Sequence, residues 1–219
     1  MRLSHAFDRV APDYDRWYDR PEGKTLFTAE KECFNAVCDH LQGRWLEVGA
    51  GTGRFSSALG IGYGIDSSPR MLEIAVARGL NGTVGSAGNL PYPGNSFDGI
   101  LMALTFCFID ETEQALQECR RVLCSDGLFL LGIVPADSRW GENYIRKAAK
   151  GHPLYSAACF RTTKETVELI ECAGFKFIDG ASTLFWKPGA KPRRQPRVKA
   201  GIVQTAGFVS LLFRKTGES

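Results

Sequence analysis

The chain has 219 residues, of which 44% are apolar and 11% aromatic, so it is long enough to bury one sizeable core, and we expect a single domain. Its formal net charge of +3 comes largely from one basic segment near the carboxyl end, and the rest is close to neutral. Polar residues interrupt every apolar stretch short of the roughly 18 residues that a membrane span needs. The first residues also lack the apolar core of a signal peptide, so we expect a cytoplasmic protein.

The seven cysteines are odd in number and scattered along the chain, and none belongs to a Cys-x-x-Cys pair. The three histidines are not spaced as metal ligands either. We therefore expect neither a disulfide framework nor a metal site. We interpret the cysteines as small buried apolar residues in a reducing compartment.

The amino-terminal segment has an aromatic-rich start and then a helical pattern over residues 25–41. No Gly/Ser-rich linker detaches it from the chain that follows. We divide the single predicted domain into an N-terminal helical segment (1–43), a cofactor-binding core (44–134), an insertion with a helix (135–174) and a C-terminal hairpin (175–219).

The most informative motif follows the first strand-like stretch, where Glu47 is followed by alternating glycines at positions 49, 51 and 53. Glycines permit a tight turn and a close approach of the backbone to a ligand. A second acid, Asp66, ends the next apolar stretch about 20 residues later, where a carboxylate can accept hydrogen bonds from ribose hydroxyls. This pattern predicts a pocket for a nucleoside cofactor.

The charge of the motif indicates which nucleoside cofactor it holds. A dinucleotide would bring a pyrophosphate to the helix after the glycines, and Glu47 would repel it. The spacing is Gly-x-Gly-x-Gly instead of Gly-x-Gly-x-x-Gly, so an NAD-dependent oxidoreductase is the least favoured alternative. S-adenosyl-L-methionine carries no phosphate, and its ammonium and sulfonium groups are cationic, so Glu47 suits it.

Strand-like runs alternate with helical patterns through the middle of the chain, which predicts a parallel sheet with helices on both faces. Ligands of such sheets lie beyond the carboxyl ends of the strands, where Glu47, Asp66, Ser86 and Ala103 fall. Two further extended stretches, 177–186 and 202–213, have no helix between them and predict a hairpin. The predicted strands of the parallel part are 45–48, 61–65, 83–85, 97–103 and 128–134, and the helices are 54–59, 69–78 and 111–123.

The hairpin loop, residues 187–199, is basic and contains no acid. Its prolines and like charges favour an extended, solvated connection. Contact with RNA, with an anionic substrate or with a partner subunit remains open as an alternative. Since no aromatic residue lies within the loop, single-strand stacking is poorly supported.

At these motifs the chain resembles the class I S-adenosylmethionine-dependent methyltransferases, over roughly residues 5–185. Within that superfamily it is most similar to the small-molecule group that includes the ubiquinone and menaquinone C-methyltransferases. The stretches that carry the resemblance are 47–53 (first motif), 65–72 (ribose motif and following helix), 85–91 (adenine loop), 96–102 (fourth strand), and 121–123 with 126–128 (turn into the fifth strand).

The resemblance implies an α/β, Rossmann-like seven-stranded sheet, mostly parallel with a C-terminal antiparallel hairpin and helices on both faces. It also implies that residues 1–43 form a lid whose Tyr14 approaches the methionine carboxylate, although Tyr14 could instead be a packing residue. Many relatives carry an acid at the place of Ser86, where this chain offers only a hydroxyl. The cofactor residues so expected are Tyr14, Glu47, Gly49, Ala50, Gly51, Gly53, Asp66, Ser67, Met71, Ser86, Ala87, Leu90 and Ala103.

In this superfamily an insertion after the fifth strand often builds the substrate pocket, and residues 135–174 hold several aromatics. They could enclose an apolar or planar substrate or simply pack a helical cap. Cys107 falls where many relatives carry a histidine, and a thiol is a poor general base, so no catalytic residue is assigned. The expected substrate pocket comprises Phe106, Cys107, Trp140, Tyr144, Tyr155 and Arg161.

The sequence thus predicts an S-adenosylmethionine-dependent methyltransferase that acts on a small-molecule acceptor and releases S-adenosyl-L-homocysteine. The chain lacks the motifs of the DNA base methylases, so nucleic acid is an unfavoured partner. Two alternatives remain: a non-catalytic module that binds the cofactor or its product, and an RNA methyltransferase that uses residues 187–199. The oligomeric state is not predicted.

Overall fold

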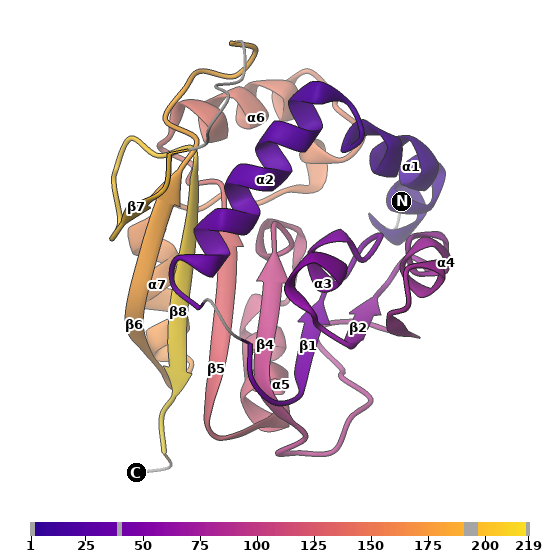
Figure 1. The fold of residues 1–219 in the computed structure, drawn as a ribbon, viewed down its shortest axis with the longest axis vertical. Coiled ribbons are helices and arrows are strands. Elements are labelled where there is room, and N and C mark those ends of the chain that lie inside the picture. Colours follow the sequence, from indigo (N-terminus) through magenta and orange to yellow (C-terminus); the bar gives the residue numbers. More distant parts are fainter. Residues whose placement is uncertain (1–2, 39–40, 191–196, 218–219) are drawn as a thin grey trace.

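The computed structural model describes residues 3–38, 41–190 and 197–217. They form an α/β fold around an eight-stranded sheet with the strand order β3-β2-β1-β4-β5-β8-β6-β7 (Figure 1). The strands from β1 to β5 run parallel, and β8 lies antiparallel between β5 and β6. The strands are β1 (Trp45–Val48), β2 (Tyr63–Asp66), β3 (Asn81–Val84), β4 (Phe97–Ala103), β5 (Leu123–Ile133), β6 (Phe175–Thr183), β7 (Lys199–Ala200) and β8 (Phe208–Lys215).

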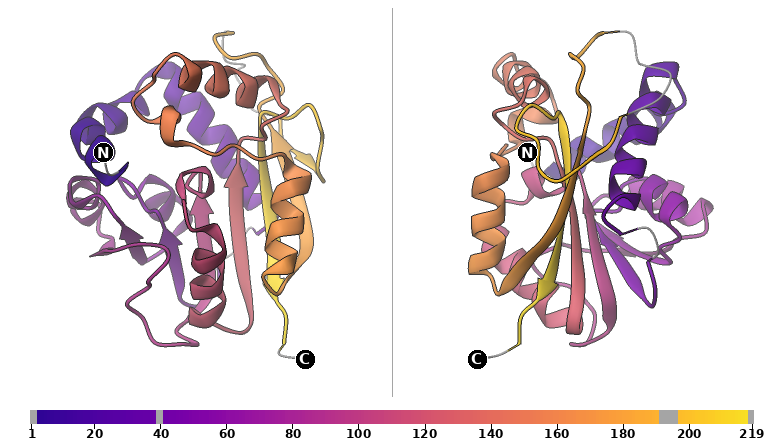
Figure 2. Two further views of the ribbon diagram at one scale, coloured as in Figure 1. Left: turned by 180° about the vertical axis from the view of Figure 1, so that it is seen from behind. Right: turned by 60° about the vertical axis from the view of Figure 1, so that its left-hand side comes forward.

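Helices cover both faces of the sheet, as the sequence predicts. Helices α2 and α3 lie on one face and α5 and α7 on the other, while α1 and α6 lie beyond the carboxyl ends of the parallel strands (Figures 1 and 2). The helices are α1 (Leu3–Trp17), α2 (Pro21–Asn35), α3 (Arg54–Leu59), α4 (Pro69–Ala77), α5 (Thr112–Val122), α6 (Arg139–Ala149) and α7 (Thr163–Cys172), with the 3₁₀ turns η1 (Phe106–Phe108) and η2 (Tyr155–Ala157).

The Rossmann-like fold class is confirmed, with one correction to the strand number. The eighth strand is β7, a two-residue strand that pairs with the edge of β6. The antiparallel hairpin is formed by β6 and β8, but β8 begins at Phe208 and not at Ile202. The pairing of β6 with β8 ends at Thr183 and Phe208, because Leu184 turns the backbone after β6 into the left-handed region with φ 57°. Just before β8 the chain turns, with the N–H of Ala206 hydrogen-bonded to the carbonyl oxygen of Val203, so Ile202 is not part of β8.

Local signals in the sequence fix the helix starts around the site. Ser68 accepts a hydrogen bond from the backbone N–H of Met71, and Pro69 follows as the first residue of α4. Ser138 caps α6 in the same way through Gly141. Thr162 and Glu165 form a reciprocal capping box at the start of α7. These caps define the first residues of α4, α6 and α7.

Three further expectations concern membrane spans, the cysteines and the basic loop. No helix among residues 3–38, 41–190 and 197–217 is long and apolar enough to cross a membrane. Cys33 and Cys119 are buried, but Cys159 and Cys172 are exposed, so the interpretation of all seven cysteines as buried residues is wrong for these two. In the basic loop, residues 191–196 lie outside the described residues.

Candidate active site

The loop after β1 turns because three of its residues are glycines. Gly49, Gly51 and Gly53 all adopt left-handed backbone conformations, with φ values of 74°, 53° and 74°. A Cβ atom at Gly49 would lie 2.1 Å from Cγ2 of Thr105, whereas a Cβ at Gly51 would meet no atom within 4 Å. The loop is therefore closely packed at Gly49 and open to a ligand at Gly51.

The carboxylate of Glu47 stabilises the start of α3. Gly53, the residue before α3, has no side chain to cap it, and Oε2 of Glu47 instead accepts hydrogen bonds from the backbone N–H (2.9 Å) and the hydroxyl of Ser56. Glu47 is 1% exposed, and burial raises its pKa to about 8, against the opposing effect of the Ser56 hydrogen bonds.

Asp66 joins the ends of β1 and β2. Its Oδ2 accepts from the N–H of Gly51 and its Oδ1 from the N–H of Ser68, each at 2.8 Å. Burial raises the pKa of Asp66, while these backbone donors oppose the rise. Each carboxylate oxygen has a second lone pair, so Asp66 can hold the glycine loop and still accept hydrogen bonds from a ligand.

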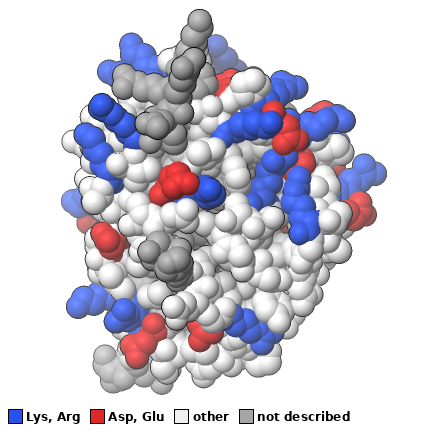
Figure 3. All heavy atoms as spheres, viewed as in Figure 1, with Lys and Arg blue, Asp and Glu red and all other residues white. Residues whose placement is uncertain are grey.

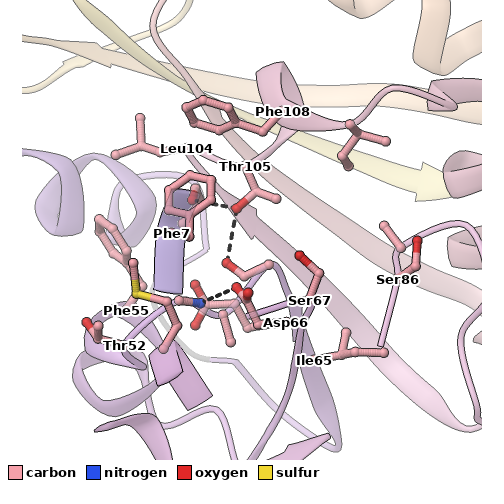
Figure 4. A pocket seen from close by; sticks show the side chains of 18 of the residues that line it. Phe7, Thr52, Phe55, Ile65, Asp66, Ser67, Ser86, Leu104, Thr105 and Phe108 are labelled. Carbon is pink, nitrogen blue, oxygen red and sulfur yellow. Dashed lines mark hydrogen bonds between the residues drawn. The ribbon is translucent and has the colours of Figure 1, made fainter. Parts of the chain in front are cut away.

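A cavity of about 350 Å³, the first cavity, lies where these strand ends meet. Figure 4 shows Thr52 and Phe55 on one side of it, Ser86 on the opposite side, and Asp66 with Ser67 between them. The predicted cofactor residues that line it are Tyr14, Glu47, Gly49, Ala50, Gly51, Asp66, Ser67, Met71, Ser86, Ala87 and Ala103.

Two predicted cofactor residues lie elsewhere. A Cβ at Gly53 would meet Cβ of Ala75 at 2.9 Å, so this glycine allows α4 to pack closely against the loop. Leu90 is 2% exposed and belongs to the apolar core on the α5 side of the sheet. For both residues close packing is enough to account for the residue type.

A second, larger cavity of about 770 Å³ adjoins the first. Its lining includes all six residues expected in the substrate pocket, Phe106, Cys107, Trp140, Tyr144, Tyr155 and Arg161. Trp140 is held by a hydrogen bond from its indole N–H to the carbonyl oxygen of Trp186, at 2.6 Å. The two cavities share five lining residues, namely Phe7, Tyr14, Tyr18, Leu104 and Phe108.

Helix α1 is fixed over the glycine loop by ion pairs that the sequence analysis missed. Asp15 accepts hydrogen bonds from Arg54 at 2.8 Å and from Arg78 at 2.6 Å, and Arg54 also pairs with Asp19 at 3.0 Å. Burial alone would raise the pKa of Asp15, but the hydrogen bonds from Arg78 and Arg54 outweigh it and lower the pKa to about 2. These residues are up to 63 positions apart, so no local pattern points to them.

The sequence reasoning passed over three further lining residues, of which only Glu30 carries a signal in the sequence. Glu30 stands among the apolar residues of α2, and an acid in such a position is itself a signal. Thr105 donates a hydrogen bond to the carbonyl oxygen of Gly49 at 3.0 Å. Leu104, between the cavities, adopts φ 58°, a conformation that leucine rarely takes and that only the structure reveals.

A glycine turn after β1, acids at the ends of β1 and β2, and a cavity beyond the carboxyl ends of a parallel sheet define a Rossmann-like cofactor-binding protein. No group of His, Cys, Asp or Glu that could hold a metal ion occurs within the described ranges.

Comparison with known proteins agrees with this class. A family described as a methyltransferase domain matches residues 46–131. The crystal structure of an S-adenosylmethionine-dependent methyltransferase from Thermotoga maritima, described as a "possible histamine N-methyltransferase", shares 34% identity and a TM-score of 0.90, and covers 98% of this chain and 100% of its own.

Two curated relatives extend the comparison. An uncharacterized protein of Mycobacterium tuberculosis is 34% identical over 96% of this chain and 74% of its own length. The demethylmenaquinone methyltransferase of Thermotoga maritima is 43% identical over 64% of this chain and 63% of its own length. The chain belongs to the S-adenosylmethionine-dependent methyltransferases, and it is an enzyme that transfers methyl groups.

Proposed function

We propose that this enzyme methylates a small molecule held in the second cavity, using S-adenosyl-L-methionine held in the first. The observation that carries the proposal is the junction of the two cavities, where Tyr14, Tyr18 and Leu104 line both. Methyl transfer requires the donor methyl group and the acceptor atom to lie in line and in contact. Two adjoining cavities with a shared wall provide such a meeting point.

The residues of the first cavity fit the cofactor in the order of its parts. Glu47 and the backbone of Gly49 and Gly51 would hold the methionine end, Asp66 the ribose hydroxyls, and Ser86 with Ala87 the adenine. Figure 4 supports this order, since the carboxyl of Asp66 lies between the glycine-loop side and the Ser86 side of the cavity. We further assign Tyr14 to the methionine carboxylate, and Ala50, Ser67, Met71 and Ala103 to the walls.

The size of the second cavity supports a small acceptor. Its volume of about 770 Å³ falls within the roughly 300–1,000 Å³ of small-molecule sites. Among the described residues on the face drawn in Figure 3, Lys and Arg are interspersed with Asp and Glu. The cavity volume is our reason to favour a small molecule over RNA. The single-domain division and the cytoplasmic location stay predictions.

The bound cofactor would supply an activated methyl group on a sulfonium centre. The chain then has to orient the acceptor and exclude water, which α6 and the aromatic residues beneath it can do. Burial raises the pKa of the Cys107 thiol to about 12 and likewise that of the Tyr155 hydroxyl to about 12. Both therefore stay protonated near neutral pH and are available as hydrogen-bond donors, not as bases.

Calorimetric titration with S-adenosyl-L-homocysteine tests the assignment of the first cavity. The Asp66→Asn variant keeps the shape of the side chain but removes its charge, so we expect at least about a tenfold loss of affinity. The matched control is Asp126→Asn. Asp126 is exposed, and its backbone lies in the left-handed region, which asparagine also tolerates well. Equal affinities for the wild type and the Asp66 variant would contradict the assignment.

Turnover tests the second half of the proposal. Methyl-labelled S-adenosyl-L-methionine is incubated with a panel of small amines, phenols and carbon acids, and release of S-adenosyl-L-homocysteine is followed. Trp140→Ala should remove one wall of the second cavity and lower turnover while cofactor affinity stays unchanged. If RNA is methylated and no small molecule is, the acceptor class is wrong.

A further inference from the structure

Two buried side-chain atoms within the described ranges have no hydrogen-bond partner, and both belong to residues that line the second cavity. They are Oε2 of Glu30 and Nη1 of Arg161. Buried polar groups in folded proteins are nearly always paired, because an unpaired one loses its water without compensation. Two such atoms in one cavity, one of a carboxyl and one of a guanidinium, indicate groups that await a ligand.

Glu30 lies on α2 with only 5% of its surface exposed. Burial raises the pKa of its carboxyl to about 8, and no neighbouring cation counteracts the rise. The other charged residues of the cavity lining that come from α1, α2 and their connection are Asp13, Arg20 and Glu22, and all three are exposed to water. Glu30 is thus the buried acid of this wall.

Four tyrosines line the second cavity together with Glu30. Burial above all, and in smaller part the charge of Glu30, raises the pKa values of Tyr14, Tyr18, Tyr144 and Tyr155. The rings of Tyr144 and Tyr155 have their centroids 4.6 Å apart. Aromatic faces next to a carboxylate attract cations and favour flat molecules.

Arg161 provides the opposite charge. Its Nη2 donates to the hydroxyl of Thr112 at 3.2 Å, and its guanidinium lies 5.5 Å from the ring centroid of Phe106. No carboxylate among the described residues forms an ion pair with it, so the free Nη1 is able to donate to an oxygen of a ligand.

From these contacts we propose that the acceptor is a small, flat-ringed molecule with two polar ends: a basic nitrogen that pairs with Glu30 and an oxygen-bearing, anionic end that accepts from Arg161. The inference rests on the proposed function, since it names the class of acceptor for the second cavity. A ligand of this class would offer a partner to each of the two unpaired atoms, and the tyrosines would enclose its ring.

Matched ligand series test this two-ended recognition. For each of three rings, imidazole, phenol and indole, we would titrate the amine, the amino acid and the amine-free propionate into the enzyme saturated with S-adenosyl-L-homocysteine, up to about 10 mM. In at least one series the amino acid should bind at least about tenfold more tightly than either one-ended analogue. Glu30→Gln should abolish the advantage over the propionate, and Arg161→Gln the advantage over the amine.

Binding of S-adenosyl-L-homocysteine in every variant shows that the fold and the first cavity are intact, and it separates the two hypotheses. No binding of this product by the wild type would refute the proposed function itself. Normal product binding with no advantage for the two-ended ligands in any series, or an advantage that survives in Glu30→Gln, would overturn the inference alone. Glu142→Gln, which changes an exposed acid of α6, is the matched control and should preserve both advantages.

Discussion

Replacing Glu30 by glutamine should change how the stability of the enzyme depends on pH. In the folded protein, burial raises the pKa of this carboxyl from the ordinary 4.5 to about 8. The folded state therefore binds a proton between about pH 4.5 and pH 8 that the unfolded chain has released. It follows that the free energy of unfolding contributed by Glu30 is fully present below pH 4.5 and is lost as the pH rises through 8.

The size of the effect follows from the pKa difference. A rise from 4.5 to about 8 is a difference of about 3.5, and each pKa unit corresponds to about 1.36 kcal/mol, which gives an upper limit of about 5 kcal/mol. Glutamine has nearly the same shape and never ionises. Relative to the wild type, the variant should therefore gain stability as the pH rises, by about 2–4 kcal/mol between pH 5 and pH 8.5, since part of the full effect falls outside this interval.

Urea denaturation at several pH values measures this difference. Burial raises the pKa of Glu47 to about 8 as well, but Glu47 is present in both proteins and its contribution cancels in the comparison. The matched control is Glu32→Gln. Glu32 is an exposed glutamate of the same helix that pairs with Lys31, so this variant should follow the wild type at every pH. A constant difference between Glu30→Gln and wild type from pH 5 to pH 8.5 would refute the reasoning.

Two further predictions concern the glycine loop and the helix above it. Gly49→Ala should lower the free energy of unfolding by about 2–4 kcal/mol, because φ is 74° and the new Cβ would lie 2.1 Å from Thr105. Urea denaturation measures this loss. The control Gly62→Ala should be neutral, because a Cβ at Gly62 would meet nothing within 4 Å. Asp15→Asn should cost about 1–2 kcal/mol at neutral pH and make the loss of stability between about pH 4 and pH 2 smaller than in the wild type, because the share of Asp15 is removed. The exposed Asp13→Asn should have neither effect.

Much of the first cavity could be predicted from the sequence because its signals are local. The turn needs glycines at alternate positions within one short loop, and Asp66 ends the very next strand, so residues close in the chain specify both features. The hairpin of β6 and β8 was foreseeable for the same reason, since two extended stretches had no helix between them. The expected start at Ile202 was wrong because strand length depends on where the partner, β6, ends.

The second cavity was only partly foreseeable. Its aromatic wall could be predicted, since Trp140, Tyr144 and Tyr155 lie close together after the fifth strand of the sheet. The opposite wall comes from α2, more than a hundred residues earlier, and the sequence gives no distance between these segments. Glu30 faces the cavity because α2 packs on β5, β6 and β8, a contact that side-chain volumes on both surfaces decide.

By itself the sequence determined the class of fold and the kind of cofactor, because hydrophobic periodicity, glycine positions and the sign of one charge act over a few residues. The tertiary structure alone decided which charged groups lose their water. Oε2 of Glu30 and Nη1 of Arg161 are left without a partner, and Asp15 becomes doubly paired, only when elements distant in the chain are packed together. Since desolvation and ion pairing depend on all the surrounding atoms, no local pattern encodes them, and the chemistry of the second cavity is a property of the folded molecule.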